Sequence, residues 1–332
     1  MTAPSLDVVA VGSAIVDVLA TADDDDLRSR GLVKGTMALV DAGRAHELYE
    51  GMGPAVEASG GSAANTVAGV ASFGGAAAFM GKVRDDLLGE VFAHDIRAVG
   101  VHYDTAPATT GAATARCLVF VTPDAQRTMT TYLGAATGLS SEDIDTAVIA
   151  AARFTYLEGY LWDPPEAISA LRLAISVSGG AGRQVALSLS DPFCVDRHRQ
   201  DFLELIDGHV DVLFANEAEI LSLFEVPTLA QAVEAIRLRD RCRVAAITLG
   251  PLGSVVVTSG GLVECPAAPV ARVVDTTGAG DLYAAGFLHG LASGAGLDRC
   301  ARLGSLAAAE VIGHVGARPQ VALAMLADQA GT

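Results

Sequence analysis

The stretch VVDTTGAGDLYAAGFLHG at residues 273–290 combines glycines, carboxylates and the start of a helical pattern. Gly278 and Gly280 allow the backbone to turn and to approach a ligand closely. The free N–H groups at the helix start, from about Ala279 to Asp281, would converge on one point and form an anion site. An aspartate-capped turn without a ligand is the alternative. The sequence contains neither G-x-x-x-x-G-K-[ST] nor G-x-G-x-x-G, the P-loop and dinucleotide-binding motifs.

A second glycine-containing segment, ASGGSAANTVAGVASFGG at residues 58–75, also leads into a helical pattern. Gly60 and Gly61 precede a helix that we expect to begin between Ser62 and Asn65. One explanation is a glycine turn followed by a helix of small residues that packs closely on a sheet. The other is a loop whose backbone lies against a sugar.

Asp17 interrupts the apolar segment VGSAIVDVLA at residues 11–20. A carboxylate in such surroundings is costly unless it is paired or solvated. Capping of a strand end and contact with a polar ligand both remain open from the residues alone.

Asn216 and Glu219 lie in FANEAEI, directly after an apolar run. Acids are common at any helix start, so this spacing alone is a weak signal. In ITLGPLGSVVV, Thr248, Gly250 and Gly253 occupy a turn between two expected strands, and a plain hairpin explains them as well. Neither motif therefore indicates a ligand site without support from the rest of the chain.

The composition restricts the classes of partner. The 332 residues carry a net charge of -17, which argues against nucleic acid and anionic membranes because both require a basic face. The five scattered cysteines, without paired spacing, indicate reduced thiols in the cytoplasm. The sequence shows neither a signal peptide nor a membrane span. We therefore expect a small-molecule ligand.

Short apolar runs alternate with helical patterns along most of the chain. The alternation predicts an α/β fold with a doubly wound, mostly parallel sheet flanked by helices. The expected strands are 7–12, 154–159, 184–190, 210–216, 244–250 and 253–259, and the helical patterns include 85–99, 165–177 and 229–240.

Two regions, 18–40 and 104–135, break this rhythm with alternating, threonine-rich segments. Alternation indicates half-exposed strands. We expect a small β-sheet formed by these inserted segments that acts as a lid on a single domain spanning 1–332. Its exposed edge strands leave a monomer and a lid-mediated homodimer both open.

The motif DTTGAGD resembles the C-terminal signature of the PfkB, or ribokinase-like, family of carbohydrate and nucleoside kinases. The resemblance covers nearly the whole chain, with the motifs in the family's order. It implies a ribokinase-like fold and phosphoryl transfer from ATP. It makes Asp281 the catalytic base that accepts a proton from the substrate hydroxyl. The amides of Gly278, Ala279 and Gly280 correspond to the anion hole for the transferred group.

The other motifs receive roles from the same resemblance. The GG-x-x-x-N pattern implies that Gly60, Gly61 and Asn65 contact sugar hydroxyls, and Asp17 matches the aspartate that grips a vicinal diol. Ser13 departs from the asparagine that nucleoside kinases of the family often carry, which puts the neighbouring contact in doubt.

The resemblance also implies where ATP and cations bind. Asn216 and Glu219 match the N-x-x-E motif that organises Mg²⁺, largely through water. Further residues are assigned to the nucleotide side of the site, and Asp275 lies in the region associated with K⁺ in the family, whose requirement here is open. These nucleotide-side residues are Thr248, Gly250 and Gly253, together with Gly313, His314 and Gly316 near the ATP base or a monovalent-cation loop; a lone histidine such as His314 is more often structural.

The segments 110–136, 155–166 and 186–199 most resemble the adenosine kinase branch. In that branch, Tyr160 and Phe193 would flank the adenine, with core packing as the alternative. Arg127, in the expected lid, would approach the phosphates on closure, with a surface arginine as the alternative. These matches predict an ATP-dependent phosphotransferase acting on the 5′-hydroxyl of adenosine in purine salvage.

Two other functions stay open. One is a sugar kinase of the same mechanism acting on fructose, ribose or a keto-deoxy sugar acid. The other is a non-catalytic nucleoside-binding protein, against which the intact DTTGAGD and N-x-x-E motifs argue.

Overall fold

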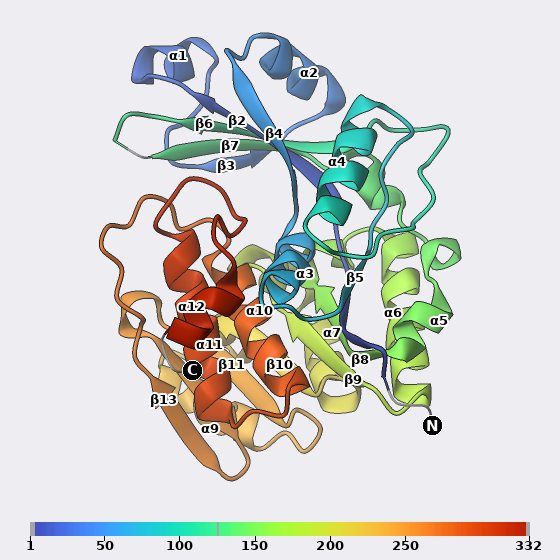
Figure 1. Cartoon of the computed structure of the whole chain (residues 1–332), viewed down its shortest axis with the longest axis vertical. Helices are drawn as coiled ribbons and strands as arrows, with labels where there is room; N and C mark the ends of the chain where they lie inside the picture. The colour runs from blue at the N-terminus through green and yellow to red at the C-terminus, as the bar shows by residue number, and fades with distance from the viewer. Residues whose placement is uncertain (1–3, 125, 330–332) are drawn as a thin grey trace.

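The computed structural model describes residues 4–124 and 126–329. It contains an eight-stranded sheet covered on both faces by helices, with a smaller five-stranded sheet at one end (Figure 1). Two predictions include residues outside the described part of the chain. The single domain over 1–332 includes residues 1–3 and 330–332, and both this domain and the segment 104–135 include residue 125. Among the residues described, no helix combines the length and apolarity needed to cross a bilayer.

The large sheet has the order β13-β12-β11-β10-β9-β8-β1-β5. Its strands run parallel except β12 and β13, which pair antiparallel at one edge. This confirms the predicted α/β class and mostly parallel sheet. The bounds are β1 Leu6–Val11, β5 Ala77–Met80, β8 Ala152–Glu158, β9 Gln184–Ser188, β10 Val212–Asn216, β11 Val244–Thr248, β12 Ser254–Thr258 and β13 Gly261–Cys265.

The central strands are apolar throughout because helices bury both of their faces. In β1, Val8 and Ala10 enter one core while Val9 and Val11 enter the other, and all four are fully buried. The first core contains residues of α3 Ser62–Ser72, α4 Leu87–Ala98, α10 Ala279–Ala292, α11 Leu297–Val311 and α12 Leu323–Gln329; the second contains residues of α5 Thr146–Ala151, α6 Pro165–Gly180, α7 Pro192–Gly208, α8 Glu217–Phe224 and α9 Leu229–Arg237.

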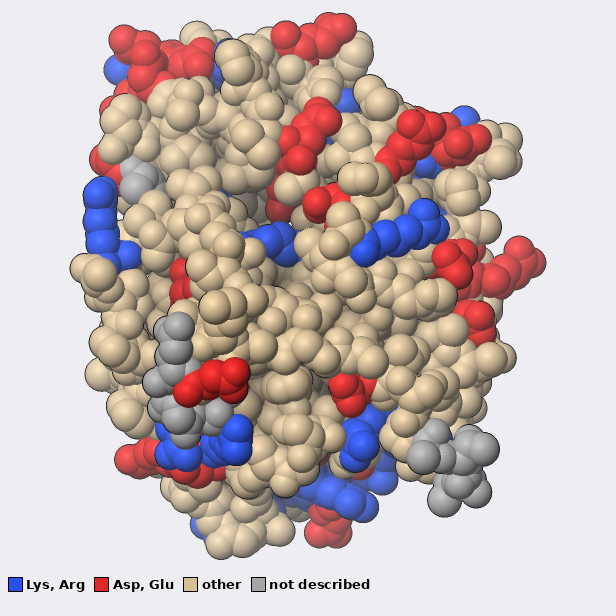
Figure 2. Space-filling model, in the orientation of Figure 1, with Lys and Arg blue, Asp and Glu red and all other residues tan. Residues whose placement is uncertain are grey.

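The small sheet has the order β3-β7-β6-β2-β4. Two short helices, α1 Asp24–Ser29 and α2 Ala42–Glu50, lie over it (Figure 1), and their Leu27 and Leu48 join the first core. Acidic side chains gather over α1 at the top of the view in Figure 2. The strands are β2 Ile15–Thr21, β3 Met37–Leu39, β4 Ala55–Gly60, β6 Ala115–Val121 and β7 Arg127–Tyr132.

The lid boundaries predicted from the sequence need correction. The segments 18–40 and 104–135 do supply most of the sheet, but β2 begins earlier and residues 104–114 form no strand of it. The prediction also missed β4, which pairs antiparallel with β2 over its whole length. Its small residues gave no apolar alternation, so its strand conformation depends on pairing with a distant segment.

Candidate active site

A cavity of about 540 Å³ lies between the small sheet and the carboxyl ends of the parallel strands of the large sheet. Ligands bind at this end of open α/β sheets. Most of the predicted site residues line it: Asp17, Gly61, Asn65, Arg127, Tyr160, Phe193, Asn216, Glu219, Thr248, Gly278, Gly280, Asp281 and Gly316. Seven others are not among its lining residues: Gly60, Gly250, Gly253, Asp275, Ala279, Gly313 and His314.

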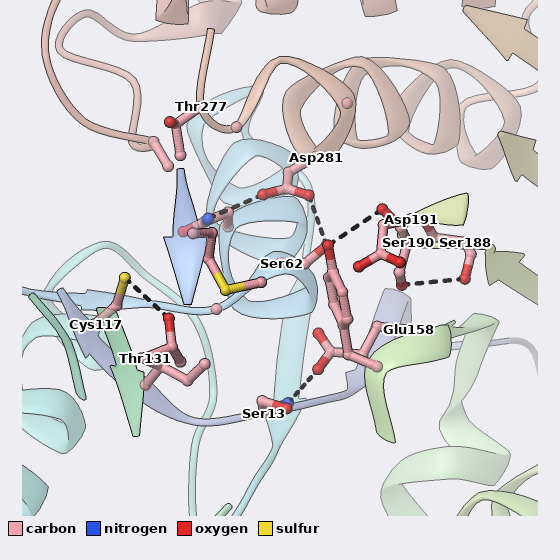
Figure 3. A pocket seen from close by; sticks show the side chains of 18 of the residues that line it. Ser13, Ser62, Cys117, Thr131, Glu158, Ser188, Ser190, Asp191, Thr277 and Asp281 are labelled. Atoms are coloured by element: carbon pink, nitrogen blue, oxygen red, sulfur yellow. Dashed lines mark hydrogen bonds between the residues drawn. The ribbon is translucent and has the colours of Figure 1, made fainter. Parts of the chain in front are cut away.

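Asp281 is the third residue of α10 and receives two side-chain hydrogen bonds from α3 (Figure 3). Ser62 Oγ donates to its Oδ1 at 2.6 Å, and Asn65 Nδ2 donates to its Oδ2 at 3.0 Å. Burial raises the pKa of Asp281, and these two hydrogen bonds oppose the rise. A carboxylate oriented in this way can accept a proton from a hydroxyl in the cavity.

The spacing between α3 and α10 depends on Gly69. A Cβ atom there would lie 2.6 Å from Ala285 Cβ and 2.7 Å from Leu282 Cδ1. Only a glycine therefore allows the two helices to approach as closely as they do. This approach brings Ser62 within reach of Asp281.

The turn before α10 is held in a left-handed conformation by Gly278, whose φ is 79°. A Cβ atom on Gly278 would lie 2.8 Å from Ala317 Cβ, so the turn is also closely packed. Thr277 lines the cavity beside it, although it was not singled out in the sequence. The N–H of Ala279 donates to Thr276 O at 3.2 Å, so this predicted anion-hole amide has an internal partner. Gly278 and Gly280 line the cavity directly.

Asp17 faces the cavity because of the alternation of β2. Val16 and Val18 are fully buried in the first core, so Asp17 points to the opposite face of the strand. Asp17 is the third residue of a seven-residue strand, so strand-end capping is wrong. Burial raises the pKa of Asp17 to about 6, opposed by the positive charges of Arg318 and Arg127.

Gly60 and Gly61 bring backbone close to Asp17 and to the β1–β2 connection. A Cβ atom on Gly60 would lie 2.3 Å from Asp17 Oδ2, and one on Gly61 would lie 2.1 Å from Ser13 O. Gly61 has a φ of 98° and is the N-cap residue of α3, which begins at Ser62 as expected. The absence of a side chain at Gly60 therefore leaves room for the carboxylate of Asp17.

Asn65 has one polar atom left for another partner. Its Nδ2 is used by Asp281, but its Oδ1 is buried and has no hydrogen-bond partner among the described residues. Buried polar atoms are normally satisfied, so this oxygen is suited to a ligand hydroxyl.

Glu158 is a lining residue that the sequence analysis missed. It is the last residue of β8, is buried, and accepts the N–H of Ser13 at 2.7 Å and that of Ala63 at 2.8 Å. It thereby joins the β1–β2 connection to the first turn of α3. A carboxylate at the end of an apolar strand was the available signal.

Asn216 and Glu219 form a capping box at the start of α8. Asn216 Oδ1 accepts the N–H of Glu219 at 2.9 Å, and Glu219 Oε2 accepts the N–H of Asn216 at 3.0 Å. Burial raises the pKa of Glu219 to about 7. Both residues line the cavity, so the cap and a cation-binding role are compatible.

The predicted nucleotide-side residues divide into two groups. Thr248 lies in the cavity wall, whereas Gly250 and Gly253 form the turn of the antiparallel β11–β12 pair. His314 lies 3.2 Å from a Glu310 oxygen, which ties it to α11. Gly316 lines the cavity, and Gly313 belongs to the same loop.

Arg127 and Asp275 form an ion pair between the small sheet and the loop before α10. The two side chains are only 8% and 3% exposed, so the surface-arginine alternative is wrong. Asp275 also accepts the N–H of Thr277 at 3.0 Å and that of Gly316 at 3.0 Å. The carboxylate is thus surrounded by donors, and its predicted association with K⁺ stays a prediction.

Aromatic side chains form the rim of the cavity. Phe193 is 76% exposed and Tyr160 is 38% exposed, although both line the cavity, so core packing is wrong for them. Arg197 Nε and Nη2 contact the two oxygens of Asp163 at 3.1 and 3.0 Å nearby.

The inner face of the small sheet supplies further lining residues that the sequence analysis did not single out. Most are apolar and come from cross-strand neighbours, which local sequence does not reveal. They are Ile15, Leu19, Met37, Leu39, Cys117, Val119, Met129 and Thr131; Ser188 at the end of β9 and Ser190 and Asp191 in the connection to α7 line the cavity from the body of the protein.

The family model of the pfkB carbohydrate kinases matches residues 46–322. Among curated proteins, the adenosine kinase of Saccharomyces cerevisiae is 29% identical over 95% of this chain and 96% of its own length.

Solved structures are similar over nearly the whole chain. The adenosine kinase of Sinorhizobium meliloti is 53% identical with a TM-score of 0.91, covering 98% of this chain and 99% of its own. A probable sugar kinase protein from Rhizobium etli CFN 42 is 47% identical with a TM-score of 0.92, covering 99% of both chains.

Proposed function

The chain belongs to the pfkB family of carbohydrate kinases, and on this premise we propose that it transfers the γ-phosphoryl group of ATP to the 5′-hydroxyl of adenosine. It is an ATP-dependent kinase, so the acceptor is the finer question.

The exposed aromatic rim carries the choice of adenosine. Phe193 and Tyr160 are exposed residues that line the cavity, whose lid side is mostly apolar apart from Asp17, Arg127 and Thr131. A purine base attached to a ribose would cover these rings and this apolar face. A monosaccharide bound at Asp17 has no second ring to bury them.

We propose that Asp17 accepts hydrogen bonds from the two vicinal hydroxyls of the ribose, since a carboxylate can accept from both at once. Asn65 Oδ1 accepts from a neighbouring hydroxyl, because it is buried without a partner among the described residues. Asp281 then accepts the proton of the 5′-hydroxyl while Ser62 and Asn65 hold its carboxylate in place.

The turn before α10 would stabilise the transferred group. Phosphoryl transfer depends mainly on positioning and on charge stabilisation. The amides of Gly278 and Gly280 lie at a helix N-terminus in the cavity wall, where fixed donors act without reorganisation. The amide of Ala279 joins them if its bond to Thr276 opens.

The residues around Glu219 fit a Mg²⁺ ion held largely by water and phosphate. Glu219 supplies a buried carboxylate in the cavity wall. In residues 4–124 and 126–329 there is no cluster of three or more His, Cys, Asp or Glu side chains arranged for a metal, and Mg²⁺ bound with a nucleotide needs few direct protein ligands. Such an ion neutralises charge on the phosphates.

We further propose that the small sheet acts as a lid that excludes water during transfer. A cytoplasmic location fits the five free, buried cysteines and would be tested by fractionation of the source cells. Light scattering distinguishes a monomer from a dimer formed through β3 or β4, and assays with and without K⁺ test the cation requirement.

The acceptor assay tests the proposed function. ADP release is measured with a panel of nucleosides and of sugars including fructose, ribose and a keto-deoxy sugar acid, and the products are identified by mass spectrometry. We expect adenosine to give the highest kcat/KM and adenosine 5′-monophosphate as product. Asp281→Asn, which should lose turnover, controls for contaminating kinases.

A sugar acceptor is the second candidate, since the similar Rhizobium etli protein is described as a probable sugar kinase. A sugar that exceeds adenosine by orders of magnitude in kcat/KM would replace the adenosine assignment. Binding without any product would instead support a non-catalytic nucleoside-binding protein.

A further inference from the structure

Residues 312–322, the connection between α11 and α12, form a strap beside the cavity. At its far end, Glu310 Oε1 accepts the N–H of Gln320 at 2.9 Å. In its middle, Gly316 donates to Asp275 Oδ2 at 3.0 Å, and Ala317 packs against Gly278. The strap is therefore attached to the turn that carries the anion site.

Arg318 extends from this strap to the small sheet. Its Nη2 donates to Ser59 Oγ at 2.9 Å, across 259 residues of sequence. Ser59 in turn donates from its Oγ and N–H to Asp95 Oδ2, at 2.6 and 2.8 Å. Ser59 precedes Gly60 in β4, and β4 pairs with the strand that carries Asp17. Arg318 thus connects the body of the protein to the strand beside the acceptor site.

Two nitrogens of Arg318 remain without a hydrogen-bond partner. Nε and Nη1 are buried and unpartnered among the described residues. A buried cation is costly unless negative charge lies nearby. Three carboxylates meet this need, those of Asp95, Asp17 and Asp281. Two of these belong to the proposed active site.

We propose that Arg318 is a positioning residue for phosphoryl transfer, which holds β4 against the strap and supplies the positive charge that stabilises the carboxylates of Asp17 and Asp281. This inference rests on the proposed function, because it assigns Arg318 a role in the chemistry of that site.

The charges around the two carboxylates support this role. For Asp281, Ser62 and Asn65 of α3 donate hydrogen bonds, and Arg318 is the cation that lowers its pKa. For Asp17, Arg318 lowers the pKa more than Arg127 does.

Two anions, Asp281 and Asp275, oppose these cations at Asp17. Loss of Arg318 therefore raises the pKa of both active-site carboxyl groups, and a larger share of each is protonated at neutral pH.

The test uses the full chain and four variants: Arg318→Gln, Arg318→Lys, Ser59→Ala and Arg302→Gln. Ser59→Ala removes the hydrogen bond and keeps the charge, and Arg302→Gln removes an exposed arginine paired with Asp298 on α11. For each variant, kcat/KM for the acceptor is measured from pH 5.5 to 9, and folding is followed by thermal unfolding.

For Arg318→Gln, we expect the acidic limb of the profile to move up by about one pH unit. That corresponds to a loss of about tenfold at pH 6 and much less at pH 9. Arg318→Lys, Ser59→Ala and Arg302→Gln should keep the limb near its wild-type position, because each retains the charge beside the two carboxylates.

A loss that is uniform across pH, with an unmoved limb, would overturn the charge role of Arg318. If Arg318→Gln does not fold, Arg318→Lys decides the question. Because this variant keeps the positive charge, an acidic limb that moves in Arg318→Lys but not in Ser59→Ala or Arg302→Gln would contradict the charge role of Arg318. If the wild-type protein phosphorylates no acceptor, the proposed function fails on its own. Carboxyl titration by NMR in wild type and Arg318→Gln then tests the inference without turnover.

Discussion

Arg127 of the small sheet and Asp275 of the loop before α10 form a buried ion pair that joins the small sheet to the body of the protein. Arg127 lines the cavity, whereas Asp275 is not among the lining residues. The small sheet is therefore attached to the loop that leads to Asp281, and its position is coupled to that of the proposed base.

Breaking this pair should loosen the small sheet. Arg127→Gln leaves Asp275 buried without its cation, so we expect the free energy of unfolding to fall by roughly 3 kcal/mol or more. Hydrogen exchange measured by mass spectrometry should accelerate in β7 and β3. Lys34→Gln, which removes a more exposed cation of the same part of the chain, should change little. Equal exchange rates in both variants would contradict the coupling.

Asp17 should make stability depend on pH. Its folded pKa of about 6 lies above its ordinary value of 3.8 because burial penalises the charged form. The folded state therefore binds this proton more tightly than the unfolded state does. The contribution of the bound proton to folding stability is complete below about pH 4 and is lost as pH rises through about 6. In thermal unfolding from pH 4.5 to 7.5, the stability of Asp17→Asn relative to the wild type should increase as pH rises. A constant difference between the two proteins would count against a raised pKa.

Ser62 should set the proton affinity of Asp281. Ser62→Ala removes a hydrogen bond that stabilises the charged carboxylate, so the pKa of Asp281 rises further. Because the base acts in its ionised form, the acidic limb of kcat should move to higher pH, with a loss of about tenfold at neutral pH. Ser72→Ala, at the other end of α3, is the matched control and should leave the limb in place. A limb unmoved in Ser62→Ala would argue against Asp281 as the base.

Gly61 and Gly74 provide a matched comparison of strain and collision. Both have positive φ angles, 98° and 86°, but a Cβ atom on Gly61 would meet Ser13 O at 2.1 Å, whereas one on Gly74 would meet nothing within 4 Å. Gly74→Ala should cost roughly 1–2 kcal/mol from backbone strain alone. Gly61→Ala should cost clearly more and raise the acceptor KM, because the first turn of α3 is displaced. Denaturant unfolding and kinetics check both; similar losses would show that close approach at Gly61 is unimportant.

Phe193 should affect binding and leave stability nearly unchanged. Since its side chain is 76% exposed, Phe193→Ala should change the free energy of unfolding by less than about 0.5 kcal/mol. Loss of stacking on the base should raise KM for adenosine about tenfold. Leu238→Ala, also highly exposed but not among the residues that line the cavity, should leave KM unchanged. An unaltered KM in Phe193→Ala would remove the main reason for preferring adenosine to a sugar.

Local sequence was enough to predict most of the elements and some of the polar groups within them. The apolar runs, Asp17 within β2, and Asp281 at the start of α10 all depend on spacing within a few residues. Periodicity and turn chemistry act at that range, so they predict such features well.

Contacts between distant segments could not be predicted in this way. Arg318 reaches Ser59 over 259 residues, and the strand conformation of β4 depends on pairing with β2. Glu158 had a local signal as a carboxylate at the end of an apolar strand, but its contacts with Ser13 and Ala63 could not be predicted because these residues lie on other elements. Each of these features belongs to the tertiary arrangement, for which a single sequence carries no local pattern.

Gly69 gives the proposed proton acceptor a control point outside the cavity. A larger residue at this helix crossing would act as a wedge between α3 and α10 and would move Ser62 and Asn65 away from Asp281. Asp17 lies on β2, outside this helix pair, whereas the proposed contact of Asn65 with an acceptor hydroxyl would change together with the contact to Asp281. We therefore expect turnover to respond to a change at a helix interface, because Gly69 does not itself line the cavity.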